Sequence, residues 1–199
     1  HIDQTLLRLT DGTRVYVQAI VDNFSRCVLA WEVSLEYGGA YTADLLRRAA
    51  LHLRIDEPPP ALWSDSGSEN VNADVHEVLS SKRFERVLAQ IDIRFSNSMI
   101  ERFFYSLKHR CLYLERLVSL DKVRELVQWF VDEHNRVMPH SAFQGQTPIE
   151  MYLGTGAHVP DELRARHRDA RRARLEQNQR ASCAACVPLR VADARDPPS

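Results

Sequence analysis

The order of strand-like and helix-like segments constrains the fold of this 199-residue chain more than any other feature. Three stretches rich in β-branched and aromatic residues come first, separated by turns such as Asp11-Gly12, which predicts an antiparallel meander. Helix and strand patterns then alternate, and such crossover connections join parallel strands. We therefore expect an α/β fold with a five-stranded mixed sheet and helices on both faces.

Turn residues, prolines and caps set the bounds of the expected elements. The expected strands are residues 2–9, 15–21, 27–34, 61–64 and 91–95. The expected helices are residues 41–53, 73–88, 97–111 and 121–134. Thr42 is the expected cap of the first helix. Thr147-Pro-Ile-Glu150 has the residues of a capping box with proline at the first helical position, so we expect another helix there, ended by Gly154.

The periodic pattern decays towards the C-terminus. We expect a core of residues 1–156 and an arginine-rich tail of residues 157–199, with a helix over 162–179 and disorder beyond it. This tail is the helical C-terminal extension of the predicted fold. Its Cys183-Ala-Ala-Cys186 is a lone pair, whereas a zinc site needs four ligands.

Composition excludes several kinds of protein but does not select a partner. The 26 basic residues nearly balance the 27 acidic ones, so a nucleic-acid surface has to come from local clustering of charge. No apolar run approaches the ~20 residues that cross a membrane, and nothing in the sequence resembles a signal peptide. Four cysteines without a regular framework favour a reducing compartment, so we expect a cytoplasmic protein without membrane partners.

Three acids stand in different settings along the chain. Asp3 lies on the first strand, Asp65 follows the 61–64 strand, and Glu101 lies near the start of the 97–111 helix; thirty-five residues separate the last two. Each has a structural explanation on its own: an edge-strand charge for Asp3, a turn cap for Asp65, and a capping box with Ser98 for Glu101. Together, three carboxylates could hold hard divalent cations, which prefer oxygen ligands.

These acids and their flanking segments resemble the Asp-Asp-Glu (DDE) catalytic core of insertion-sequence transposases and retroviral-type integrases. The resemblance covers residues 1–156, and its segments come in the family's order. They are Asp11-Gly-Thr-Arg-Val-Tyr, Val21-Asp-Asn-Phe-Ser-Arg26, Ser64-Asp-Ser-Gly-Ser-Glu-Asn70, Asn97-Ser-Met-Ile-Glu-Arg-Phe-Phe104 and His134-Asn-Arg-Val-Met-Pro-His-Ser-Ala-Phe143. Gln4 departs from the pattern, but it should lie on the sheet face opposite Asp3.

The resemblance implies a ribonuclease-H-like fold and a metal-dependent recombinase. Asp3, Asp65 and Glu101 would be both the catalytic residues and the ligands of two Mg²⁺ ions, with Mn²⁺ as a substitute. The reaction would be phosphodiester cleavage followed by strand transfer, which needs no protein nucleophile. DNA, as transposon ends and as target, would be the partner of a homo-oligomer.

Other residues have less certain roles in this resemblance. Lys108 shares a helical stripe with Glu101, and Lys108, His109 and Arg110 are candidate DNA-binding residues; a solvated helix face would also explain them. His134, Asn135, Pro139 and His140 are expected to serve packing and hydrogen bonding.

The chain starts with His1, so we expect a fragment that lacks the family's N-terminal DNA-binding domain. Two alternatives remain open at this point. The chain could be a ribonuclease-H-like nuclease without strand transfer, or a catalytically incomplete remnant that binds DNA or a partner transposase.

Overall fold

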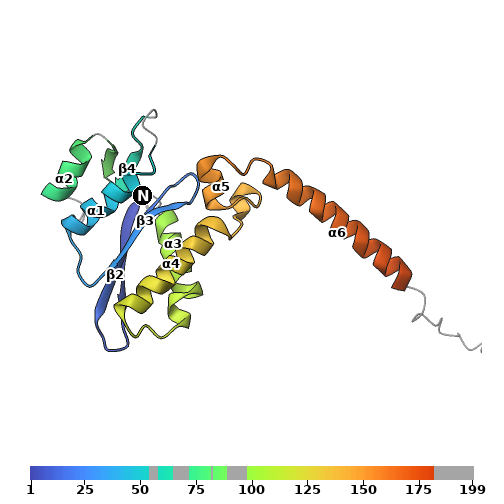
Figure 1. Cartoon of the computed structure of the whole chain (residues 1–199), viewed down its shortest axis with the longest axis horizontal. Coiled ribbons are helices and arrows are strands. Elements are labelled where there is room, and N and C mark those ends of the chain that lie inside the picture. The colour runs from blue at the N-terminus through green and yellow to red at the C-terminus, as the bar shows by residue number, and fades with distance from the viewer. Residues whose placement is uncertain (54–57, 65–71, 82, 89–97, 182–199) are drawn as a thin grey trace, which may run out of the picture. The chain divides into compact units, whose positions relative to one another are not determined.

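The computed structural model describes residues 1–53, 58–64, 72–81, 83–88 and 98–181. Strands β1 (Ile2–Arg8), β2 (Arg14–Val21) and β3 (Val28–Ser34) come first, followed by helix α1 (Gly39–Ala50), β4 (Ala61–Ser64), α2 (Ala73–Ser80) and β5 (Glu85–Leu88). The second half is helical, with α3 (Ser98–Arg110), η1 (Leu112–Leu114), α4 (Leu120–Arg136), η2 (Ser141–Phe143), α5 (Pro148–Leu153) and α6 (Val159–Ala181). The described chain thus contains five strands and helices between and after them (Figure 1).

The strands form two hydrogen-bonded sheets, one of three strands and one of two, that lie next to each other. β1, β2 and β3 are antiparallel, and Asp3 is opposite Ala19 in the first pair. β4 and β5 pair in parallel. β4 also contacts β1, and the ring of His1 stacks on that of Trp63 at 6.1 Å between centroids. The start of β1 is therefore next to the end of β4.

The two faces of the sheet pack against different helices (Figure 1). Successive side chains of a strand point to opposite faces. Leu7, Val15 and Val17 belong to a core shared with α3 and α4. Ile2 and Ile20 belong to a core shared with α1 and α2. The predicted helices on both faces are present.

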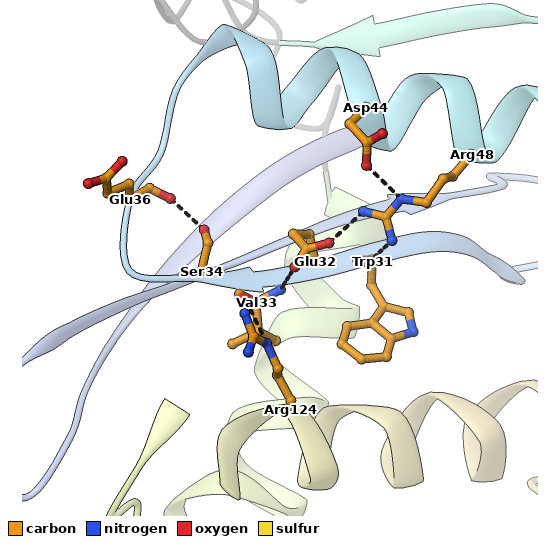
Figure 2. A network of polar contacts seen from close by, with 8 residues as sticks. All are labelled: Trp31, Glu32, Val33, Ser34, Glu36, Asp44, Arg48 and Arg124. Carbon is orange, nitrogen blue, oxygen red and sulfur yellow. Dashed lines mark hydrogen bonds and ion pairs between the residues drawn. The ribbon is translucent and has the colours of Figure 1, made fainter. Parts of the chain in front are cut away.

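Polar contacts attach β3 to helices on either side of it (Figure 2). Arg48 of α1 donates to the Trp31 carbonyl at 3.0 Å and to the Glu32 carboxylate at 2.7 Å. Arg124 of α4 donates to the Val33 carbonyl at 3.2 Å. The two guanidinium groups thus bond the carbonyls of Trp31 and Val33, the residues before and after Glu32. An edge strand would otherwise leave such carbonyls available for pairing with a further strand.

Two local predictions from the sequence were wrong. The first helix begins after Gly38, and Thr42 lies inside it, buried, where its hydroxyl accepts a hydrogen bond from Gln18 Nε2 at 2.9 Å. The expected helix over 73–88 is α2 followed by β5, because Glu85–Leu88 pairs with β4. The strand expected at 91–95 lies outside the described residues.

The chain divides into two compact units, His1–Ala157 and His158–Ser199. The second unit contains α6, which is longer at both ends than the helix expected over 162–179. The disorder expected after it falls outside the described residues. Within the described ranges, no helix has the length and apolar character needed to cross a bilayer.

Candidate active site

Asp3 is positioned by the register of β1 with β2. It is half-buried, lies opposite Ala19, and accepts a hydrogen bond from the Gln4 amide on Oδ1 at 2.8 Å. Alternation along the strand places Asp3 on the same face as Leu7, which is the face that α3 and α4 cover. Gln4 is opposite Gln18, whose side chain bonds to α1, so it lies on the other face as the sequence predicted.

Glu101 lies in the first turn of α3 and is exposed to solvent. The opposite side of this helix is anchored by four buried residues, Ile100, Phe103, Phe104 and Leu107. They pack in the same core as Leu7 and Val17, and α3 contacts both β1 and β2. The helix that carries Glu101 therefore covers the sheet face that carries Asp3.

The capping box suggested as an alternative role for Glu101 does not match the helix start. A capping box needs the serine at the N-cap position, before the first helical residue. Ser98 is itself the first residue of α3. The preceding Asn97, the expected cap, lies outside the described residues.

Asp65 lies outside the described residues, as do Ser66 and Glu69. The residue before it, Ser64, is buried at the end of β4. Since Trp63 stacks on His1, β4 ends beside the first residues of β1.

The donor set suits a hard divalent cation in its chemistry. Carboxylates are the protein ligands that Mg²⁺ prefers, and Glu101 forms no ion pair with any described residue. Among the described residues, no group of three or more His, Cys, Asp or Glu side chains could hold a metal ion. Asp65 lies outside the described residues, so this absence says nothing of the expected triad.

The exposed surface of α3 carries basic and aromatic side chains beyond Glu101. Lys108 is two turns along the same stripe and is half-buried, and burial lowers the pKa of its ammonium group. Next to this stripe, the centroid of the His109 ring lies 4.3 Å from that of the Tyr105 ring and 5.2 Å from that of the Tyr113 ring. Consecutive helical residues point about 100° apart, so Lys108 and Arg110 face different directions from α3.

His134 and Asn135 hold the β2–β3 connection, as predicted for their motif. Asn135 accepts from the Val28 amide and donates to the Val28 carbonyl, both at 2.9 Å. His134 Nε2 lies 2.9 Å from the Arg26 carbonyl, and since a carbonyl only accepts, this nitrogen carries the proton. Burial lowers the pKa of His134, and the nearby His140 lowers it further.

The helix start expected at Thr147 is confirmed. Thr147 and Glu150 form a reciprocal capping box, Pro148 is in the first turn, and Gly154 ends α5 in the left-handed conformation at φ 69°. Positive φ is the region that favours glycine.

The cysteines described by the structure have no visible part in the site. Cys27 and Cys111 are buried, unbonded thiols. Burial raises the pKa of Cys27 to about 12, and burial also raises that of Cys111. Cys183 and Cys186 lie outside the described residues.

Comparison with known proteins identifies the family. Two family models, both described as integrase core domain, match residues 1–100 and 94–148. The fold and these matches define the class, and the chain belongs to the integrase core domain family.

Individual relatives agree with this assignment. The chain is 27% identical over 147 residues to transposase InsF for insertion sequence IS3A of Escherichia coli (strain K12), a match that covers 73% of this chain and 50% of that protein. The chain thus spans about half the length of the curated relatives it matches.

Solved structures confirm the ribonuclease-H-like fold. A chain of the simian T-cell lymphotropic virus intasome in complex with PP2A regulatory subunit B56 gamma matches with a TM-score of 0.63 and 16% identity, over 76% of this chain and 52% of that one. The HTLV-2 integrase catalytic core domain, in complex with magnesium, matches with a TM-score of 0.59 and 15% identity, over 76% of this chain and 93% of that one.

Proposed function

We propose that this chain is the catalytic core of a DNA transposase, which carries out metal-dependent phosphodiester cleavage and strand transfer. The observation that carries the proposal is the placement of Glu101 on a helix that packs on the sheet face of Asp3. Family membership and the similarity to transposase InsF support the same conclusion. Residues 1–156 would be this core, and residues 157–199 would be a tail outside it.

We assign Asp3, Asp65 and Glu101 as the ligands of a pair of Mg²⁺ ions. When bound, such ions activate the attacking oxygen and neutralise charge on the phosphate and leaving oxygen. The chain's own part would be to hold Asp3 on β1 and Glu101 on α3, so that packing of the sheet against α3 sets the positions of these two carboxylates. Asp65 directly follows β4 in the sequence. Lys108, on the stripe of Glu101, would contact a phosphate of the DNA end.

DNA is the proposed partner, both as donor end and as target, and the working form would be a homo-oligomer on that DNA. The curated relative is a transposase, and the chain shares its fold with a chain of a viral intasome. A bacterial transposase acts where the chromosome is, so we place the protein in the cytoplasm.

The proposal is tested by strand transfer from pre-cut donor ends into supercoiled plasmid with Mg²⁺. Glu101→Gln should abolish cleavage and joining while changing the free energy of unfolding by less than about 0.5 kcal/mol, because Glu101 is exposed. Glu115→Gln, another exposed acid just beyond α3, is the matched control and should retain activity.

Three results would count against the assignment. Full activity of Glu101→Gln would remove this residue from the mechanism. Cleavage without any joined product would favour a nuclease. Cutting with Ca²⁺ as efficient as with Mg²⁺ would argue against a site that depends on strict octahedral geometry.

A further inference from the structure

A groove whose described lining consists of basic, neutral polar and apolar side chains lies beside the candidate active site. It has a volume of about 540 Å³ and is formed by the β2–β3 connection, α3, α4 and the segment around η2. Among the residues that the structure describes, no acid lines it, although the chain has 27 acids against 26 bases. Its cationic and hydrogen-bonding lining residues include Arg26, Arg102, Arg110, His134, His140 and Ser141.

The three arginines of this groove have no acidic partner among the described residues. None of Arg26, Arg102 and Arg110 forms an ion pair there. Arg102 lies over the Tyr105 ring, 5.3 Å from its centroid, and Arg26 donates to the carbonyl and side-chain oxygens of Asn23. The described contacts of both guanidinium groups are thus with neutral groups.

The histidines of the groove respond to this excess of positive charge. Burial and the charge of Arg26 lower the pKa of His140. Burial and His140 lower that of His134, against an opposing effect of its bond to the Arg26 carbonyl. Both imidazoles are therefore mainly neutral near pH 7, and an anion in the groove would favour their protonation.

The groove adjoins the strand pair that positions Asp3. Val21 lines it and lies two residues along β2 from Ala19, the partner of Asp3; two residues of a strand span about 7 Å. On α3 the groove is lined by Met99, Phe103, Ser106 and Arg110, which share one side of the helix at about 100° per residue, while Glu101 and Lys108 lie on the opposite side. The groove therefore starts near Asp3 and follows the side of α3 that faces away from Glu101 and Lys108.

We propose that this groove binds the sugar–phosphate backbone of a DNA duplex and guides it towards Asp3, with Arg102 and Arg110 as the main phosphate contacts. Guanidinium groups match phosphate oxygens through paired hydrogen bonds. A surface whose described lining contains three arginines and no acid, supplied by separate segments, is the local clustering of charge that the balanced composition requires. The proposal rests on DNA being the substrate, and it deepens the proposed function by naming a second binding surface beyond the Lys108 stripe.

The test is DNA binding without catalysis, by fluorescence anisotropy of a labelled mixed-sequence duplex in EDTA over a range of salt concentrations. Arg102→Glu should weaken binding roughly tenfold or more, as expected for loss of a charged hydrogen bond, and should lower the salt slope by about one. Arg14→Glu is the matched control, because Arg14 is exposed, lies outside the groove and undergoes the same charge change. Equal weakening by the two substitutions would overturn the proposal.

A second measurement locates the DNA. The ring signals of His140, assigned by comparison with His140→Gln, should show a higher pKa with the duplex bound than without it. An unchanged pKa of His140 would overturn the groove as the binding surface. These results are separable from the proposed function: a chain that binds DNA through the groove but never cuts it with Mg²⁺ would refute only the catalytic assignment.

Discussion

Asn135 provides the most direct test of how α4 fixes the site. Its amide makes two hydrogen bonds, at 2.9 Å each, to the main-chain amide and carbonyl of Val28. Val28 is 5% exposed, so water cannot readily replace these bonds. Asn135 thereby ties α4 to the start of β3, directly after the turn that contains Arg26.

The expected cost of Asn135→Ala follows from these two bonds. At about 1 kcal/mol net for each, the free energy of unfolding should fall by about 2 kcal/mol, and by more if the Val28 groups stay buried without partners. For a chain of this size that corresponds to a fall in Tm of roughly 4–8 °C. Asn135→Asp should cost at least as much, because a carboxylate cannot donate to the Val28 carbonyl and places two acceptors together.

The assay is urea unfolding followed by tryptophan fluorescence. The three tryptophans, Trp31, Trp63 and Trp129, all belong to the unit His1–Ala157, so the signal reports that unit. Gln128→Ala is the control on the same helix, because among the described residues its amide bonds only to an exposed carboxylate, that of Asp132; it should change stability by less than about 0.5 kcal/mol. An Asn135→Ala effect no larger than this control would refute the reasoning.

Two further expectations come from pKa shifts. Burial raises the pKa of Cys27 to about 12, so this thiol should react with a thiol reagent at pH 8 only as fast as the chain unfolds. Cys111 is also buried with a raised pKa, and its reaction should be slow as well. Rapid labelling of both thiols in native buffer would contradict this. The pKa of His134 is lowered in the folded chain, so as the pH falls the unfolded chain binds a proton at His134 before the folded chain does. The contribution of His134 to the free energy of unfolding is therefore fully present above about pH 6.5 and should decrease as the pH falls below that value. His134→Gln should reduce this fall, which for one proton is at most about 1.4 kcal/mol per pH unit; identical pH profiles would exclude His134 as a source.

Local signals in the sequence predicted the elements whose ends are set by their own residues. The Thr147 capping box, with Pro148 and Gly154, was confirmed because the cap, the first turn and the stop all lie within one short segment. Alternation along β1 correctly separated Asp3 from Gln4, because a strand's side chains alternate whatever it packs against.

The errors fall where a distant partner overrides the local preference. Thr42 has a side chain that can cap a helix, but packing of α1 against β2 places its hydroxyl where it accepts a hydrogen bond from the buried Gln18. Residues 85–88 continue a helical composition, yet their pairing with β4 makes them a strand. Neither partner is near in sequence, so no local pattern could have indicated it.

The sequence by itself determined the class of fold, the three acids and the helix that carries Glu101, because periodicity, caps and motif spacing are properties of neighbouring residues. Only the tertiary structure decided that α3 covers the sheet face of Asp3, and that Arg26 and Arg102, which no motif singled out as ligands, line one groove with Arg110. The physical reason is that charge acts through space. Residues far apart along the chain make a common electrostatic surface only after the core has packed and brought their elements together.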